Sequence, residues 1–149
     1  MQLTEVKDIR TGVLLYYDND TVSPMWHQCD AFLTPPNLRL TYFTPSGKPV
    51  TRTILVANGM DARSIASTNC AAIPPPMLDG KSPYVFEVEF ANSITEKFAA
   101  ISALERGGWV SSVWYVLETK LSMSMKLTNA KGIRFSRRRL ALLFRPFII

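Results

Sequence analysis

The 149-residue sequence is poor in charged residues, in histidine and in long apolar runs. Its single histidine, His27, leaves one position for any Ser–His or Cys–His catalytic scheme. No apolar run reaches the roughly 18 residues that predict a membrane-spanning helix. The glycine-rich motifs that bind nucleotide phosphates are also absent. These absences disfavour a transmembrane protein and a nucleotide-using enzyme.

Cysteine is equally scarce. Cys29 and Cys70 are the only two, which is too few for a disulfide framework. The first residues lack the basic and apolar regions of a secretory signal. We therefore expect no signal peptide, cytoplasmic synthesis and reduced thiols, with a single Cys29–Cys70 disulfide as the alternative. Incorporation in a virion or another large complex is compatible with this expectation.

The sequence does contain a large apolar fraction. Hydrophobic residues make up 47% and aromatic residues 11% of the chain, while charged residues, at 19%, fall below the usual quarter. A chain of this length is expected to form a single domain, residues 1–149, and to bury about 70% of its unfolded surface. Part of the apolar surface is expected to contact a partner.

Most of the chain predicts β-strands. Residues 13–17 form a short apolar run before a turn-rich segment. Residues 38–43 and 50–56 flank a connector with Pro and Gly, which predicts a hairpin. Residues 84–90 alternate apolar and acidic side chains, as a half-buried strand does. Residues 25–33 give a weaker strand signal.

One helix is predicted, at residues 94–106. Ser93 and Glu96 have the spacing of a capping box, apolar residues follow at helical spacing, and Gly107–Gly108 would end the helix. The apolar segment 109–117 is then predicted as a buried strand. The expected fold class is mainly β (α+β), an antiparallel β-sandwich or small barrel with one α-helix packed on the sheet.

The last thirty residues differ from the rest. Residues 120–149 hold eight Lys or Arg and no Asp or Glu, so they carry +8. The nine Lys or Arg and twelve Asp or Glu of residues 1–119 sum to −3. Residues 121–127 alternate as a core strand, and a turn at 129–132 precedes renewed alternation at 133–136. This pattern predicts a basic C-terminal hairpin followed by an apolar end.

The basic side chains of this region could meet phosphates, an acidic protein surface or only solvent. Glu87 and Glu89 of a neighbouring copy are one possible acidic surface. The candidate residues for nucleic-acid or acidic-partner binding are Lys126, Lys131, Arg134, Arg137, Arg138, Arg139 and Arg145.

Two segments are candidate protein interfaces. The end of the chain is too apolar for a free tail, and strand addition to a neighbour would bury it. Residues 57–83 form a long irregular segment with three consecutive prolines, and such loops are usually functional or ordered by a partner. The candidate interface residues are Leu140, Leu142, Leu143, Phe144, Phe147, Ile148, Ile149, Pro74, Pro75 and Pro76.

Catalytic and metal-binding signals are weak. His27 and Cys29 would share one face of a strand, where they could form a dyad or two metal ligands. No second Cys/His cluster completes such a site, so a structural histidine beside a structural thiol is the better interpretation. The paired acidic residues fit solvated turns and strand faces. We predict no catalytic residue, no metal, no cofactor and no small-molecule substrate.

The function predicted from these observations is a non-catalytic structural or assembly protein. It would be a homo-oligomer or a subunit of a larger, virion-like complex that uses the apolar end and the proline-rich loop for protein contacts. The alternative is a sequence-nonspecific nucleic-acid-binding protein that uses the basic hairpin. A small enzyme with His27 and Cys29 is the least favoured function. For the apolar end itself, contact with a membrane surface is ranked below burial in the domain's own sheet or in a neighbour.

Overall fold

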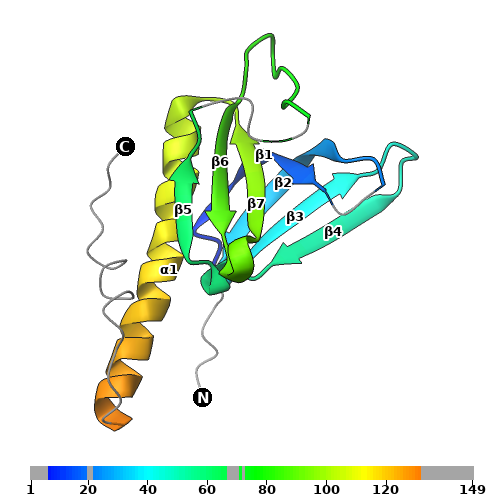
Figure 1. Cartoon of the computed structure of the whole chain (residues 1–149). Coiled ribbons are helices and arrows are strands. Elements are labelled where there is room, and N and C mark those ends of the chain that lie inside the picture. The colour runs from blue at the N-terminus through cyan, green and yellow to red at the C-terminus, as the bar shows by residue number, and fades with distance from the viewer. Residues whose placement is uncertain (1–6, 20–21, 67–70, 72, 132–149) are drawn as a thin grey trace.

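The computed structural model describes residues 7–19, 22–66, 71 and 73–131, with side chains up to Lys120. These residues form one seven-stranded antiparallel sheet and a long C-terminal helix (Figure 1). The strands are β1 (Arg10–Asp18), β2 (Met25–Thr34), β3 (Asn37–Phe43), β4 (Pro49–Ile54), β5 (Asp61–Ser64), β6 (Tyr84–Glu89) and β7 (Thr95–Ala100). The helices are α1 (Ala103–Lys131) and the short 3-10 turns η1 (Val56–Asn58) and η2 (Ala91–Ser93).

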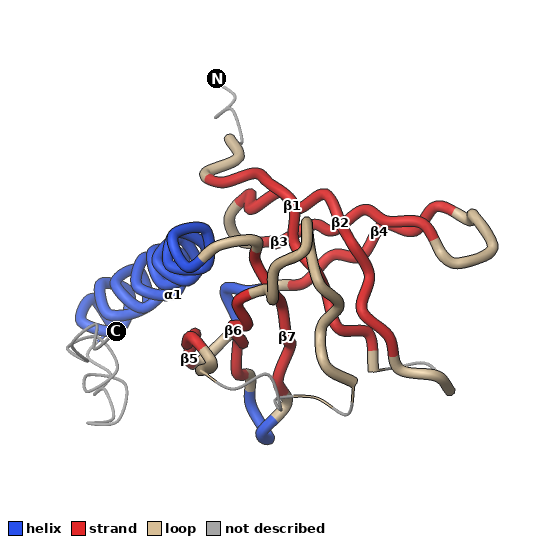
Figure 2. The backbone as a smooth tube through the Cα atoms, turned by 90° about the horizontal axis from the view of Figure 1, so that it is seen from above, coloured by secondary structure: helices blue, strands red, loops and turns tan. Residues whose placement is uncertain are grey.

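The strand order is β4-β3-β2-β1-β7-β6-β5. The sheet bends between β1 and β7, and α1 packs across one side of it, against β5, β6, β7 and η1 (Figure 2). A mainly antiparallel β fold with one helix on the sheet is therefore confirmed. The sheet does not close on itself, and the sandwich or barrel part of the prediction is not confirmed.

The five strands predicted in the first ninety residues are correct in type. Residues 13–17 lie in β1, 25–33 in β2 and 84–90 in β6, and the predicted hairpin is β3 and β4. In β3 every second side chain is buried on the inner face of the sheet, because successive side chains of a strand point to opposite faces.

β1 is buried on both faces, which explains its continuous apolar run. On the inner face, Leu14 and Tyr16 belong to the main core, together with Trp109 of α1. On the outer face, Leu15 and Tyr17 belong to a second group, here called the outer apolar cluster. The cluster consists of Leu15, Tyr17, Trp26, Val85 and Ala99, with Ile65, Ala71 and Leu78 of the β5–β6 connection packed against it.

The helix predicted at residues 94–106 is wrong for most of its length. Ser93 has a φ of 61° and follows Asn92 with a φ of 63°, a left-handed conformation that differs from the extended one of an N-cap. The two residues instead form the tight β6–β7 turn, which the amide of Phe90 closes on the Ile94 carbonyl at 2.7 Å. The following residues form β7, which pairs with β6 on one side and β1 on the other.

The strands predicted at residues 109–117 and 121–127 are also wrong, because both segments lie in α1. Trp109, Val113, Val116 and Leu117 are buried against the sheet, at the i, i+4, i+7, i+8 spacing of an apolar helix face. Most of the turn predicted at 129–132 is helical as well. The basic hairpin is therefore wrong as far as Lys131, and its remainder lies outside the described residues.

Candidate functional site

Polar side chains gather on the inner face of the sheet, where the apolar core ends. On this face of β1 the side chains become more polar along the strand, from Leu14 through Tyr16 to Asp18. Neighbouring strands add further polar groups at the same level. We call this group the inner polar cluster, and it consists of Tyr16, Asp18, His27, Tyr42, Arg52 and Glu96.

One half of the inner polar cluster centres on Glu96. The Tyr16 hydroxyl donates a hydrogen bond to its Oε2 at 2.6 Å, and Arg52 Nη2 lies 3.8 Å from its Oε1. The guanidinium of Arg52 also lies over the Tyr16 ring, 5.3 Å from its centroid. Burial, followed by the hydrogen bond and the negative charge of Glu96, raises the pKa of Tyr16 far above its ordinary value. The phenol is thus a fixed hydrogen-bond donor.

The other half centres on His27. Its ring stacks on Tyr42 with 4.2 Å between centroids, and its Nε2 lies 3.6 Å from Oδ2 of Asp18. All three residues are buried. With two carboxylates and one guanidinium, the inner polar cluster offers no excess of positive charge to a phosphate.

Cys29 does not form a dyad with His27, although both residues lie buried in β2 as predicted. The thiol of Cys29 donates to the backbone carbonyl of His27 at 3.3 Å and not to the imidazole ring. Burial raises the pKa of Cys29 to about 12, whereas a nucleophilic thiol needs a lowered pKa. Among the described residues, no three His, Cys, Asp or Glu side chains are placed to hold a metal ion.

A second charged group lies on the outer face of β5, β6 and β7. Arg63 contacts three carboxylates: Asp61 at 2.9 Å, Glu87 at 2.7 Å and Glu89 at 3.1 Å. Lys97 lies 3.9 Å from the second oxygen of Glu87. The acidic strand face that was a candidate partner surface for a neighbouring copy is therefore paired within the chain.

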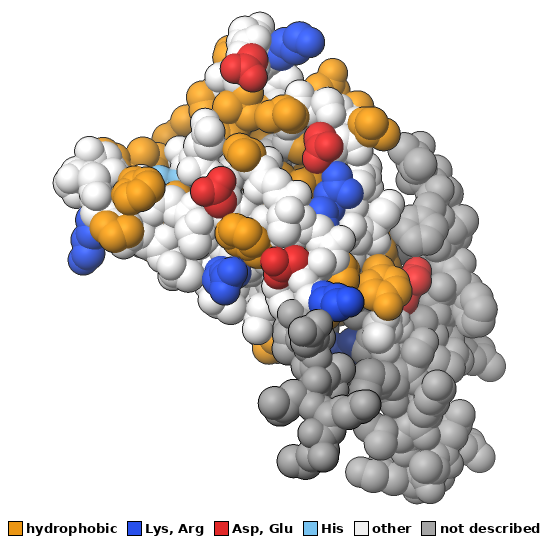
Figure 3. All heavy atoms as spheres, turned by 180° about the vertical axis from the view of Figure 1, so that it is seen from behind, with side chains coloured by type: hydrophobic (Ala, Val, Ile, Leu, Met, Phe, Trp, Pro, Cys, Tyr) orange, Lys and Arg blue, Asp and Glu red, His pale blue; other side chains and the backbone are white. Residues whose placement is uncertain are grey.

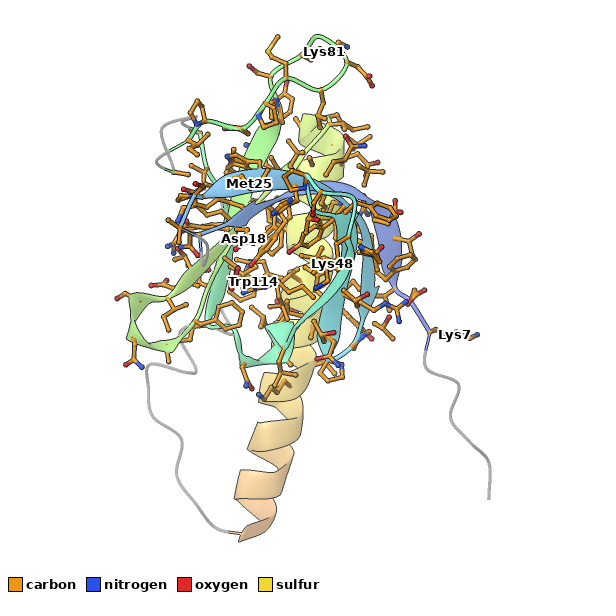
Figure 4. The ribbon with its side chains drawn as sticks, turned by 90° about the vertical axis from the view of Figure 1, so that its right-hand side faces the viewer. Lys7, Asp18, Met25, Lys48, Lys81 and Trp114 are labelled. Atoms are coloured by element: carbon orange, nitrogen blue, oxygen red, sulfur yellow. The ribbon has the colours of Figure 1, made fainter. Side chains whose placement is uncertain are left out.

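Positive charge is dispersed over the described surface. Arg10 pairs with Glu105 at 3.0 Å, and Arg52 and Arg63 are paired as given above. Figure 4 shows Lys7, Lys48 and Lys81 well apart from one another. On the face drawn in Figure 3, acidic and basic side chains are interspersed among apolar ones. On that face the basic side chains do not form a separate patch.

The two edges of the sheet differ. At the β5 edge, Trp114 of α1 donates from Nε1 to the backbone carbonyl of Ala62 at 2.7 Å, so the helix occupies this edge. At the other edge, β4 is hydrogen-bonded only to β3, and it forms the border of the sheet in Figure 1. Within the described sheet, β4 is thus an edge strand whose hydrogen-bonded neighbour is β3.

The ladder register shows what the β4 edge offers. The amide of Thr44 donates to the carbonyl of Lys48 at 2.9 Å, and β3 and β4 continue in the same register. Since hydrogen-bonded and non-hydrogen-bonded pairs alternate in an antiparallel ladder, the backbone N–H and C=O groups of Thr51 and Thr53 point away from β3. Both threonine side chains are exposed. The alternating β-branched residues of 50–54 were the sequence signal for this strand, but its edge position was not predictable.

Most of the predicted site residues lie outside the described residues: Arg134, Arg137, Arg138, Arg139, Leu140, Leu142, Leu143, Phe144, Arg145, Phe147, Ile148 and Ile149. Lys126 and Lys131 lie in α1, and nothing is described of their side chains. Pro74, Pro75 and Pro76 lie in the β5–β6 connection, far along the chain from the basic residues. Their roles stay predictions.

None of the described helices combines the length and apolar character that crossing a membrane requires. No protein-family model matches the chain, and no curated protein is similar to it in sequence.

Solved structures with the same fold are PH domains. The pleckstrin homology domain of human KIAA0053 protein is 18% identical with a TM-score of 0.53, and the match covers 78% of this chain and 94% of that one. The C-terminal PH domain of pleckstrin, in complex with an inositol pentakisphosphate, is 18% identical with a TM-score of 0.51, covering 76% and 99%. The DH/PH fragment of PDZRhoGEF, in complex with human RhoA, is 10% identical with a TM-score of 0.51, covering 76% of this chain and 29% of that one.

This similarity corrects the predicted function. The chain has a PH-domain-like fold, and two of these solved structures are complexes, one with an inositol pentakisphosphate and one with human RhoA. A structural or assembly protein of a virion-like complex is therefore the wrong prediction, and the nucleic-acid-binding alternative is not supported either. The error arose because the basic, apolar C-terminal region dominated the interpretation, while the α1 helix that defines the fold was taken for strands.

Proposed function

We propose that the chain is a non-catalytic binding module that docks an extended segment of a protein partner along β4. The observation that carries the proposal is the difference between the two sheet edges. Trp114 occupies the β5 edge at Ala62, whereas the β4 edge presents the outward backbone groups of Thr51 and Thr53. An exposed row of such groups is a template for another strand.

The length and composition of β4 support this role. The strand spans six residues, which matches a short extended peptide. Pro49, at its start, lacks an N–H and limits pairing to the residues that follow. Thr51 and Thr53 favour extended backbone, and their exposed side chains can contact the side chains of an added strand on the same face.

A phosphorylated small ligand is a weaker candidate for the described part of the chain. Recognition of several phosphates needs several converging cations. Here Arg52 is paired with Glu96 and Arg63 with three carboxylates. The inner polar cluster holds two carboxylates against one guanidinium, which favours neutral hydrogen-bonding groups over a polyanion.

The basic residues of 126–145 are proposed as contacts for an acidic part of the same partner. Their sequence charge supports this role, since residues 120–149 contain no Asp or Glu. Charged segments of this kind raise association rates and confer salt dependence more than they raise affinity.

Peptide selection tests the β4 proposal. A display library of random unstructured peptides is selected on the immobilised chain, and the most enriched peptide is then measured by calorimetry against variants. Thr51→Pro removes one outward N–H at an edge position where proline is tolerated, and we expect it to weaken binding about tenfold or more, as the loss of about 1.4 kcal/mol would. Thr51→Val keeps the N–H and the branched side chain, and it should bind like the wild type.

Two results would overturn the proposal. One is a failure of the β4 test, either because the library yields no binder or because a folded Thr51→Pro variant binds the selected peptide as tightly as the wild type. The other is saturable binding of inositol pentakisphosphate that is lost in Arg137→Ala/Arg138→Ala/Arg139→Ala, because the functional surface would then be the basic segment and its ligand an anion.

A further inference from the structure

The proline-rich part of the β5–β6 connection has a regular pattern of exposure. Residues 73, 74, 76 and 77 are exposed, whereas 75 and 78 are partly buried. The repeat of three matches the polyproline II helix, which has three residues per turn and no internal hydrogen bonds. Residues 74–77 carry no other secondary structure. Prolines at 74–76 fix this backbone, because each restricts its own φ and the conformation of the residue before it.

The pattern divides the segment into three edges. One edge, Pro75 and Leu78, faces the domain, and Leu78 packs against the outer apolar cluster. The other two edges are Ile73 with Pro76, and Pro74 with Met77. Ile73 is 40% exposed and Met77 is 61% exposed. The chain thus presents a ridge of four exposed apolar side chains, of which Met77 accepts a contact from the Ser82 hydroxyl on its sulfur at 3.8 Å.

Both ends of the ridge are held in place. Trp26 Nε1 donates to the carbonyl of Ile73 at 2.8 Å, so the ridge begins on the outer apolar cluster. At the other end, Leu78 and Lys81 exchange backbone hydrogen bonds of 2.9 Å in both directions, around a tight turn in which Asp79 and Gly80 have positive φ. In Figure 1 this connection rises beyond the end of the sheet, and Figure 4 places Lys81 at its tip.

We infer that Ile73–Met77 is a ligand for a domain with an aromatic-lined groove that binds polyproline II segments. Such grooves insert the ridges of a preformed polyproline II helix between aromatic side chains. A segment that is already extended and anchored at both ends loses little conformational freedom on binding. The ridge is made of apolar side chains without charge, which suits aromatic walls. This inference is independent of the β4 edge.

The test uses the whole chain and three purified domains, one each of the SH3, WW and EVH1 classes. Each domain is isotope-labelled and titrated with the wild-type chain, and its amide chemical shifts are followed. We expect at least one domain to bind, with shift changes confined to its aromatic groove. The ridge variant Pro74→Ala/Met77→Ala removes one exposed edge and should weaken this binding about tenfold, as the loss of interface anchors does.

The matched control is Pro45→Ala/Met60→Ala, which changes an exposed proline and an exposed methionine elsewhere on the chain. It should bind like the wild type, and both double variants should keep the wild-type thermal midpoint. The inference is overturned if none of the three domains binds, if the shift changes lie outside the groove, or if the ridge variant binds as tightly as the control.

Discussion

At the scale of single residues, buried polar groups in this protein are placed by their hydrogen-bond partners. Tyr16 reaches across to Glu96 on β7, and His27 lies between Tyr42 and Asp18. A buried polar side chain without a partner would cost about 1–3 kcal/mol. These contacts therefore favour one arrangement of β1, β2 and β7 in the inner polar cluster.

Cys29 should be inert toward thiol reagents in the folded protein. Its pKa is raised to about 12 by burial, with a further contribution from the charge of Asp30, so only about 10⁻⁴ of the thiol is ionised at pH 8. In a Cys70→Ala variant at that pH, a disulfide reagent should react with Cys29 on unfolding in urea and only very slowly before it. A native reaction as fast as that of a free thiol would contradict the burial of Cys29.

The raised pKa of Cys29 also predicts that the folded protein loses stability at alkaline pH. Because the folded pKa lies above the unfolded value of about 8.5, folding favours the protonated thiol. The contribution of the protonated Cys29 thiol to the free energy of unfolding is complete below about pH 8.5. It is lost as the pH rises toward 12. A Cys29→Ala variant should lack this part of the alkaline transition in urea unfolding curves.

At the residue scale the sequence allowed part of the site to be predicted. The spacing of His27 and Cys29 placed both on one strand face, because strand periodicity is local. The partners of His27, Asp18 and Tyr42, come from β1 and β3. They depend on sheet register, which a single sequence does not determine.

At the scale of elements, β7 and α1 show how tertiary contacts override local signals. Ser93 and Glu96 have the spacing of a capping box, yet hydrogen bonding to two neighbouring strands places residues 95–100 in the sheet. The strand periodicity of 121–127 is equally compatible with a helix, since alternating Leu and Met are strong helix formers. For β7 the pairing partners on β1 and β6 lie outside the segment itself, and its local pattern could not reveal them.

Gly107 and Gly108 were expected to end a helix, but they lie inside the first turns of α1. Gly107 has open space around the position of a Cβ, so Gly107→Ala should raise the free energy of unfolding by about 1 kcal/mol. A Cβ on Gly108 would collide with the guanidinium of Arg10. Gly108→Ala should raise the free energy of unfolding much less, because Arg10 would have to leave its position over Trp109 and beside Glu105.

Urea unfolding of the two variants measures this difference. An additional Arg10→Ala substitution should remove the collision, so Gly108→Ala should then be as stabilising as Gly107→Ala in the same background. If both glycine variants raise the free energy of unfolding equally in the wild-type background, the packing of Arg10 against α1 is contradicted.

At the scale of the whole molecule, α1 joins the core to a sheet edge through one side chain. Trp114 packs in the core and donates to the carbonyl of Ala62 at 2.7 Å. Trp114→Phe should lower the free energy of unfolding by about 1–3 kcal/mol, since it leaves a buried carbonyl without that donor.

Tyr115→Phe is the control for this change, because Tyr115 is the neighbouring aromatic residue of α1 and is exposed. It should shift the free energy of unfolding by less than about 0.5 kcal/mol. If urea curves of the two variants coincide, then the Trp114 hydrogen bond does not stabilise the edge of β5.

For the overall architecture, the sequence predicted only the fold class, a mainly antiparallel β protein with one helix on the sheet. Local apolar runs and alternation predicted β1, β2 and β6 as single strands and β3 with β4 as a hairpin. The helical covering of β5 to β7 was missed, because Trp109, Val113 and Leu117 fit both a buried strand and an apolar helix face. Scarce cysteine and a single histidine made catalysis the least favoured hypothesis, and that expectation stays a prediction. The predicted partner class depended on basic residues that lie mostly outside the described residues.

The junction between β1 and β7 has a consequence for the order in which the chain folds. Its register comprises two residue pairs, Leu15 with Ala99 and Tyr16 with Phe98, and the Tyr16–Glu96 hydrogen bond beside it spans 80 positions of sequence. The other strand pairings join segments much nearer to each other along the chain. Because closing a long loop costs entropy before its contacts form, the two halves of the sheet should collapse separately. Their joining at β1 and β7 would then be the slow step of folding.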